Sequence, residues 1–296
     1  MHLDTERFFN SRTFCGLTPE QSDYATSRVV ILPVPYDSTT SARAGSREGP
    51  AAIISASCDI ELYDVGTGLE PYRWGIHTLP DVLPDMGSPE RTVRRTEEIA
   101  RELLADGKFV VTLGGEHTVS VGPVRAHKER YPNMSVLAID AHADLRDDYL
   151  GTPYNHACIL RRHLDVCPVV QVGLRSASVE EARLIQERAL PFYSPARYRS
   201  LEDGPAEVLS GLTEDVYITV DLDGFDPSQV SGVGTPEPGG LLWDEVDALF
   251  RRVAANRRIV GFDITELNPP YGRIADAQLA AKLAYRLLGL ALGPAE

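Results

Sequence analysis

Carboxylate and imidazole side chains recur in three short motifs whose spacing suits divalent metal ions. D-A-H-A-D occupies residues 140–144, D-L-D occupies residues 221–223, and G-G-E-H-T carries His117. In extended backbone, residues two apart share a face, so Asp221 and Asp223 can point the same way, and the alternate members of D-A-H-A-D can do so too. The candidate metal ligands are therefore His117, Asp140, His142, Asp144, Asp221 and Asp223.

Six such ligands exceed the needs of one small ion and suffice for two divalent ions that share carboxylates. The four aspartates carry −4 and two divalent ions carry +4, so the loaded cluster is close to neutral. Without metal, crowded like charges predict strongly raised pKa values for some of the carboxyl groups. Carboxylates and imidazoles without a thiolate favour Mn(II) over zinc, and Fe(II), Co(II) or Ni(II) also fit.

The elements that must position these ligands are short apolar runs, each followed by a stretch with helical spacing. Several runs are apolar at consecutive positions, which is typical of strands in a parallel sheet that is buried on both faces. Ser88 and Pro89 predict the start of a helix that Gly107 ends, and a last helix is expected from about Asp276. The predicted strands are residues 29–33, 109–113, 136–139, 169–174, 216–220 and 259–262.

The candidate ligands follow these strands directly, and a fourth polar segment, D-I-T-E at 263–266, follows the last strand. Open parallel sheets bind ligands at the carboxyl ends of their strands, so the motifs are expected to meet at one edge. The chain has no internal repeat and no long Pro/Gly/Ser linker. One three-layer α/β domain spanning residues 1–296 is the simplest expectation.

Composition narrows the class of protein and its partners. The 296 residues are 43% hydrophobic and 24% charged, which is ordinary globular usage and excludes disordered and collagen-like chains. A net charge of −14 argues against nucleic acid or anionic membranes as partners and fits a small cation better. The first residues, MHLDTERFFN, contain acids and no apolar run, so a cytoplasmic protein with reduced cysteines is expected.

The motifs together resemble the signatures of the ureohydrolase (arginase and agmatinase) family, and agmatinases most of all. The resemblance rests on the order and separation of five segments, and P-V-P-Y-D-S-T-T at 33–40 extends it toward the start of the chain. It implies an αβα sandwich with a central, mainly parallel, eight-stranded sheet, assembled as a trimer or hexamer. It also implies hydrolysis of a guanidino group to urea and an amine, with two Mn(II) per subunit. The five segments are G-G-E-H-T at 114–118, D-A-H-A-D at 140–144, V-D-L-D-G-F-D-P at 220–227, G-T-P-E-P-G-G at 234–240 and D-I-T-E-L-N-P at 263–269.

The resemblance assigns the ligands to two ions, with Asp140 and Asp221 bridging. His117 and Asp144 complete the first site, and His142 and Asp223 complete the second. It also places Glu266 against the substrate guanidinium and makes His156 a proton shuttle.

These roles fit the chemistry. A guanidinium is a poor electrophile, and two divalent ions can lower the pKa of a shared water from about 15.7 toward neutrality. Asp144 is expected to orient that water and to pass a proton toward the departing amine, with His156 relaying protons to solvent. Taken alone, Glu266 could instead be a helix cap or a salt-bridge partner, and His156 a surface histidine. A Cys158–His156 nucleophile is less favoured, because residues 157–160 predict a buried helix start.

The loop at 145–155 is expected to border the far end of the substrate. Its net charge is −1, and acids attract an ammonium group, which favours agmatine, hydrolysed to putrescine in polyamine biosynthesis. Aminopropylagmatine fits equally well. The residues expected to bind substrate are Asp147, Asp148, Tyr154 and Asn155, together with Glu266.

Other activities remain as alternatives to the agmatine reaction. A guanidino acid such as guanidinobutyrate needs a cation, which Arg146, Arg161 or Arg162 can supply. A non-catalytic polyamine or guanidine sensor is disfavoured because all candidate ligands are present. A single-zinc deacetylase is disfavoured by the second ligand pair, His117 and Asp144.

Overall fold

The computed structural model describes residues 12–295, so the expectation drawn from the first ten residues lies outside the described part. Eight strands form one sheet in the order β2-β1-β3-β8-β7-β4-β5-β6. All of its strand pairs are parallel, which sharpens the expectation of a mainly parallel sheet. The strands are β1 (Val29–Val34), β2 (Ile76–Thr78), β3 (Phe109–Gly114), β4 (Ser135–Ile139), β5 (Val169–Val172), β6 (Phe192–Tyr193), β7 (Asp215–Asp221) and β8 (Arg258–Thr265).

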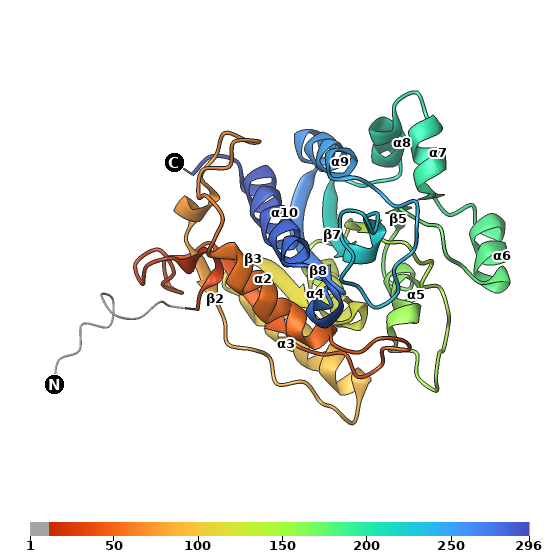
Figure 1. Cartoon of the computed structure of the whole chain (residues 1–296), viewed down its shortest axis with the longest axis horizontal. Coiled ribbons are helices and arrows are strands. Elements are labelled where there is room, and N and C mark those ends of the chain that lie inside the picture. Colours follow the sequence, from red (N-terminus) through yellow and green to blue (C-terminus); the bar gives the residue numbers. More distant parts are fainter. Residues whose placement is uncertain (1–11, 296) are drawn as a thin grey trace.

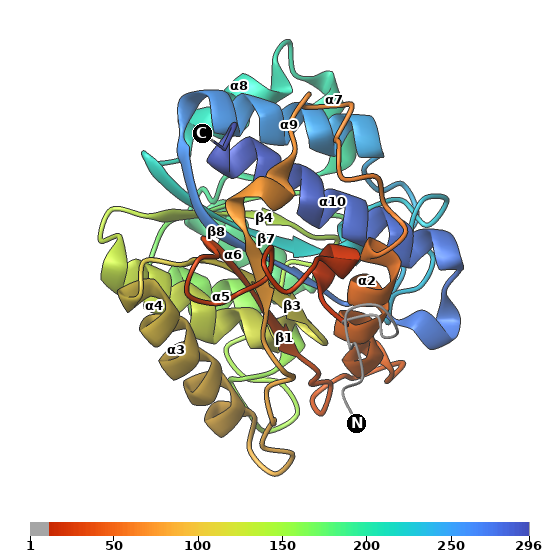
Figure 2. The same cartoon turned by 90° about the vertical axis from the view of Figure 1, so that its left-hand side faces the viewer.

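Helices cover both faces of the sheet, giving the three layers expected from the sequence (Figures 1 and 2). One face packs against α2 and α7 to α10, and in Figure 1 α2 and α10 run side by side over it. The other face packs against α3 to α6. The helices are α2 (Gly49–Ser57), α3 (Pro89–Ala105), α4 (Val121–Arg130), α5 (Ile159–Leu164), α6 (Val179–Glu187), α7 (Pro195–Ser200), α8 (Gly204–Ser210), α9 (Trp243–Asn256) and α10 (Ile274–Leu292).

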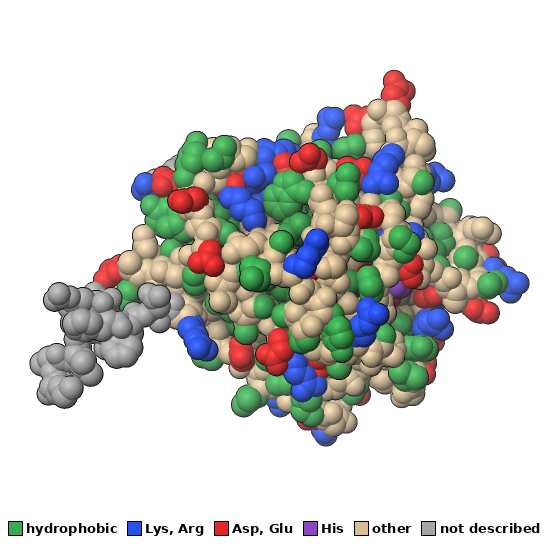
Figure 3. Space-filling view, in the orientation of Figure 1, with side chains coloured by type: hydrophobic (Ala, Val, Ile, Leu, Met, Phe, Trp, Pro, Cys, Tyr) green, Lys and Arg blue, Asp and Glu red, His purple; other side chains and the backbone are tan. Residues whose placement is uncertain are grey.

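Local chemistry explains the ends of the predicted helices. Ser88 caps α3 by accepting from the backbone N–H of Arg91 (3.2 Å), and Gly107 follows the helix with a φ of +74°. The last helix begins at Ile274, two residues before the expected start. Within the described residues, no helix has both the length and the apolar character needed to cross a membrane. Figure 3 shows acidic and basic side chains interspersed over the face it presents.

The sheet order brings the four polar segments together. β3, β8, β7 and β4 are consecutive neighbours in the middle of the sheet. Their carboxyl ends therefore lie side by side, and each is followed, or ended, by one of the motifs singled out above. The prediction that four strands deliver their polar residues to one edge is confirmed.

Candidate metal centre and active site

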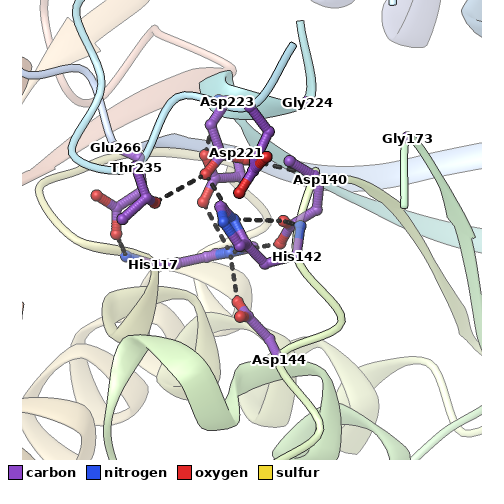
Figure 4. Close-up of polar contacts among 12 residues, drawn as sticks. His117, Asp140, His142, Asp144, Gly173, Asp221, Asp223, Gly224, Thr235 and Glu266 are labelled. Atoms are coloured by element: carbon purple, nitrogen blue, oxygen red, sulfur yellow. Dashed lines mark hydrogen bonds and ion pairs between the residues drawn. The ribbon is translucent and has the colours of Figure 1, made fainter. Parts of the chain in front are cut away.

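The six candidate ligands converge on one buried cluster (Figure 4). Nδ1 of His117 lies 3.2 Å from Oδ2 of Asp140, 3.4 Å from Oδ2 of Asp221 and 3.7 Å from Oδ2 of Asp144. Nδ1 of His142 lies 2.9 Å from Oδ2 of Asp223 and 3.9 Å from Oδ1 of Asp140. Two groups of ligand atoms are each compact enough to hold an ion: His117, Asp140 and Asp221, and Asp140, His142 and Asp223.

Two of the ligand atoms are buried without a hydrogen-bond partner among the described residues. They are Nδ1 of His117 and Oδ2 of Asp140. Buried polar atoms are normally paired, so an orphaned nitrogen and an orphaned carboxylate oxygen that lie 3.2 Å apart need a third partner. A divalent cation satisfies both atoms, and the donor set of carboxylate oxygens and imidazole nitrogens fits one.

A second layer of hydrogen bonds fixes how His117 faces the cluster. Oγ1 of Thr219 donates to Oδ1 of Asp263 (2.7 Å), and it lies 2.8 Å from Nε2 of His117. Because the hydroxyl has one proton, it must accept from Nε2 of the imidazole. Nε2 therefore carries a proton, and Nδ1 is left to face the carboxylates as a ligand atom.

The charges of the cluster shift the pKa values of its members in the metal-free protein. Burial, with help from Asp144, raises the pKa of Asp140 to about 7. Burial opposes protonation of His142, but the neighbouring Asp223 carboxylate outweighs it and raises the pKa of His142 to about 11. The pKa values of Asp144 and Asp221 are raised as well, mainly by burial, whereas for Asp223 burial is outweighed by the neighbouring His142, which lowers the pKa of Asp223 to about 2. Raised values for some of the carboxyl groups are what the sequence predicts.

Asp144 and Glu266 reach the cluster from an unusual backbone conformation. Their φ angles are +48° and +66°, in the left-handed region that costs a non-glycine residue about 1–2 kcal/mol. Surrounding hydrogen bonds hold both residues there: Asp144 O accepts from the N–H of Arg161 (3.0 Å), and the N–H of Glu266 donates to Gly115 O (2.7 Å). Backbone strain of this kind tends to gather at functional sites.

The carboxyl group of Glu266 is buried beside the ligand cluster. Its Oε1 accepts from the backbone N–H of His117 (2.8 Å). Burial, reinforced by the nearby Glu116 carboxylate, raises the pKa of Glu266 well above its ordinary value. A cation placed beside Glu266 would favour the carboxylate form and form charge-assisted hydrogen bonds with it.

The cluster opens into a cavity of about 300 Å³ whose wall includes Asp144, Glu266 and His156. His156 is half-buried, and burial, together with the neighbouring His142, lowers its pKa to about 4. The three residues predicted to be catalytic therefore face one space. Cys158 is fully buried behind it, and burial raises the pKa of its thiol to about 12, as expected for a structural cysteine.

The other four residues predicted to bind substrate do not line this cavity. The chain turns at 149–152, where Tyr149 and Thr152 exchange backbone hydrogen bonds, and of this loop Arg146 and Tyr149 line the cavity. Asp147, 78% exposed, pairs with Arg162 (2.6 Å), and with Asp148 it lines a neighbouring hollow.

Tyr154 and Asn155 have structural contacts instead. Tyr154 packs beside the apolar cluster of Val93, Val121 and Ile159. Asn155 is buried, accepts from the N–H of Ala157 (2.9 Å) and donates to Thr39 O (3.0 Å). Both residues thus lie outside the cavity lining, and their contact with substrate stays a prediction.

Several cavity residues were missed by sequence reasoning. Ser176, Ser178 and Glu181 come from a segment outside the quoted motifs, whereas Thr235 lies in G-T-P-E-P-G-G at 234–240 and Ser41 follows P-V-P-Y-D-S-T-T at 33–40. One signal was available for Ser178 and Glu181, whose S-x-x-E spacing forms a capping box at the start of α6. The missed polar residues are Ser41, Tyr149, Ser176, Ser178, Glu181 and Thr235.

Comparisons with known proteins agree with this geometry. Residues 27–289 match the profile of the arginase family. An N(1)-aminopropylagmatine ureohydrolase from Synechocystis is 38% identical over 279 residues, covering 90% of each chain. An agmatinase from Bacillus anthracis is 34% identical, covering 90% of this chain and 93% of its own. Among solved structures, the agmatine ureohydrolase of Thermoplasma volcanium superposes with a TM-score of 0.86 at 32% identity, covering 96% of this chain and 95% of its own.

Proposed function

Because the chain belongs to the arginase family, and the two relatives compared above carry the names of hydrolases of guanidino compounds, we propose that it hydrolyses a guanidino-terminated polyamine to urea and the free amine. Our first candidate substrate is N(1)-aminopropylagmatine, and agmatine is the second. The observation that carries the proposed chemistry is a cluster of six ligand side chains, four of which line one cavity together with Glu266 and His156. The four are His142, Asp144, Asp221 and Asp223.

Two divalent ions, with Mn(II) as the proposed metal, would be held by the six ligands with Asp140 shared between the two groups. When bound, such ions supply a water-derived nucleophile near neutral pH and offset the charge of the aspartates. The side chains of the protein supply everything else that the reaction needs: orientation of the substrate and transfer of protons.

Glu266 would hold the substrate guanidinium. Its carboxyl group is buried at the cavity wall, where charge-assisted hydrogen bonds to a planar cation are strong. These bonds orient the guanidinium carbon toward the ligand cluster and reduce the entropic cost of attack.

Asp144 and His156 would move protons during the reaction. The carbon–nitrogen bond breaks only after the departing nitrogen gains a proton, because an amide anion is a poor leaving group. Asp144 faces both the ligand cluster and the cavity, so it can accept the proton of the attacking water and deliver it to that nitrogen. His156 lines the same cavity and is half-buried, so it can exchange the proton with solvent.

The charge of a neighbouring hollow supports N(1)-aminopropylagmatine, the longer of the two candidate substrates. A second hollow, of about 590 Å³, shares Arg146, Ser178 and Glu181 with the cavity. Its lining carries five carboxylates against two guanidinium groups, which favours a chain of ammonium groups. The relative that is 38% identical carries the name of an aminopropylagmatine ureohydrolase, and one that is 34% identical the name of an agmatinase.

A guanidino acid is the competing class, and one observation favours it. Arg146 lines the cavity itself, where it could meet a carboxylate. Arg162 is instead held by Asp147 (2.6 Å), and neither it nor Arg161 lines the cavity.

Urea release tests the proposal directly. The protein is loaded with Mn(II) and assayed with N(1)-aminopropylagmatine, agmatine, arginine and guanidinobutyrate at matched concentrations. We expect the highest kcat/KM with N(1)-aminopropylagmatine and activity with agmatine. Preference for guanidinobutyrate would overturn the polyamine assignment, and absence of urea with every compound would overturn the hydrolase assignment.

Cytoplasmic location and a trimeric or hexameric assembly remain predictions. Light scattering on the purified protein tests the assembly.

A further inference from the structure

The guanidinium of Arg175 is bound to backbone carbonyls from three separate segments. Nη2 donates to Asp223 O (2.7 Å) and Phe225 O (3.2 Å), and Nη1 donates to Gly224 O (3.3 Å). Nη1 also donates to Gly173 O (3.0 Å). The remaining contacts go to the carbonyls of Glu237 and Pro238, at 2.8 to 3.3 Å.

The backbone of the same residue binds the other ligand-bearing segment. The N–H groups of Arg175 and Ser176 both donate to Ala141 O, at 2.8 and 2.9 Å. The N–H of Ala143 donates back to Ser176 O at 3.0 Å. Residue 175 therefore holds D-A-H-A-D through its backbone and D-L-D through its side chain.

Those two segments carry five of the six proposed ligands. The contact between them that matters most joins His142 Nδ1 to Asp223 Oδ2 (2.9 Å). Gly173 and Gly224, whose carbonyls Arg175 binds, also pack against Asp140: a Cβ on Gly173 would lie 2.6 Å from Asp140 O, and one on Gly224 2.8 Å from Asp140 N. Figure 4 shows these two glycines beside the ligand cluster.

We propose that Arg175 is a positioning residue that sets the separation of the D-A-H-A-D and D-L-D segments, and so the geometry of the ion site formed by Asp140, His142 and Asp223. This inference rests on the proposed binuclear centre. It concerns a residue that coordinates nothing itself and acts through the backbone of Asp223.

Arginine suits this task better than lysine does. A guanidinium offers five donors in a rigid plane, whereas an ammonium offers three on a flexible stem. Six carbonyls converge on Arg175, so a lysine would leave several of them without a partner.

The test compares Arg175→Lys and Arg175→Met with the same two changes at Arg257. Arg257 is a matched control, because it is also half-buried and donates to three carbonyls, those of Leu209, Leu212 and Asn256, at the opposite end of the sheet. Each protein is titrated with Mn(II) without substrate, and bound metal is counted by mass spectrometry. Circular dichroism confirms folding.

We expect wild type and the Arg257 variants to bind two ions per chain. Both Arg175 variants should keep one tight ion and bind the second about 10- to 100-fold more weakly, the range seen when outer-shell support of a metal site is removed. Arg175→Lys keeps the inference testable if Arg175→Met does not fold.

Wild-type affinity for both ions in a folded Arg175→Lys protein would overturn the inference, and equal losses in the Arg257 variants would do the same. A wild-type protein that binds two ions, and loses the second on substitution at Arg175, supports the inference even if no guanidino compound is hydrolysed. Failure of the proposed function is thereby distinguished from failure of the proposed role. A wild-type protein that binds fewer than two ions would overturn the binuclear centre itself and the role of Arg175 with it.

Discussion

The backbone N–H of Ser41 donates to Nε2 of His156 at 3.2 Å, and Oγ of Ser41 lies 2.9 Å from the same nitrogen. Because a backbone N–H can only donate, Nε2 presents its lone pair to the loop, and the proton of the neutral ring resides on Nδ1. The hydroxyl of Ser41 can donate to the neutral ring or accept from the protonated one. Ser41 can therefore keep its hydrogen bond to His156 in both charge states of the imidazole.

Replacing His156 by alanine should lower kcat far more than it changes KM, because a proton relay acts on the chemical step. Loss of general acid–base help usually costs about 10²- to 10⁴-fold. Ser41→Ala should lower kcat by a smaller factor. Steady-state kinetics of urea release measure both effects. His77→Ala is the control, since His77 binds Ser22 O (2.7 Å) and does not line the cavity. An unchanged kcat in His156→Ala would assign His156 a structural role.

Asp223→Ala should abolish urea release while leaving the fold intact. The change removes the partner of His142 Nδ1 and one of the three ligand groups of the second ion site. Metal analysis should find one ion per chain in place of two. Asp165→Ala, which removes an exposed carboxylate at the end of α5, is the control. Wild-type turnover in Asp223→Ala would contradict the ligand assignment.

The central strands could be predicted from the sequence because their signal is long and apolar. The six predicted strands all occur. Eleven of their twelve ends lie within two residues of the predicted ends, and β8 extends three residues further, to Thr265. The missing ones, β2 and β6, have three and two residues and lie at the two edges of the sheet. Elements this short carry no periodicity, and tertiary pairing alone makes them strands.

The ligand cluster could be predicted because its residues follow those strands directly, so the topology alone brings them together. The residues that line the sides of the cavity could not be predicted in this way. Asp147 and Tyr154 lie in the predicted loop, but Asp147 pairs with an arginine and Tyr154 packs against an apolar cluster, while Tyr149 of the same loop lines the cavity. Ser41 approaches His156 from 115 positions away, a proximity that depends on how two loops pack.

Gly173→Ala should weaken metal binding and destabilise the fold. Gly173 has a φ of +121°, so a side chain there strains its own backbone. The added Cβ would also lie 2.6 Å from the carbonyl oxygen of Asp140, which is a proposed metal ligand. Overpacking typically costs about 1–3 kcal/mol. Gly107→Ala isolates the strain, because Gly107 has a φ of +74° with no atom near its absent Cβ. Denaturant unfolding and Mn(II) titration compare the two variants. Equal metal affinity in both would show that the contact with Asp140 is unimportant.

Asp64→Asn should destabilise the protein in a pH-dependent way. Burial alone would raise the pKa of Asp64, but the hydrogen bonds from Arg286 (2.5 Å) and Lys282 (2.9 Å) hold it well below its ordinary value of 3.8. A depressed carboxyl pKa stabilises the fold above the unfolded pKa, and this stabilisation is lost as pH falls through the folded pKa.

At pH 7 we therefore expect Asp64→Asn to cost about 3 kcal/mol, the low end for breaking a buried ion pair, and the cost to shrink below pH 4. Denaturant unfolding at several pH values measures it. Asp203→Asn removes an exposed pair with Arg252 and should cost under about 1 kcal/mol. A pH-independent cost at Asp64 would contradict the linkage.

Neutralising the hollow beside the cavity should separate the two candidate substrates. Asp148 and Glu180 both line it without lining the cavity, so Asp148→Asn with Glu180→Gln removes two charges from the far wall. We expect KM for N(1)-aminopropylagmatine to rise about tenfold, equivalent to about 1.4 kcal/mol, and KM for agmatine to change little, because the shorter chain does not reach the acids. Glu90→Gln combined with Glu98→Gln, both on α3 and outside the hollow and the cavity, removes the same number of charges and is the control. Equal changes for both substrates, or no change for either, would show that the hollow does not receive the aminopropyl group.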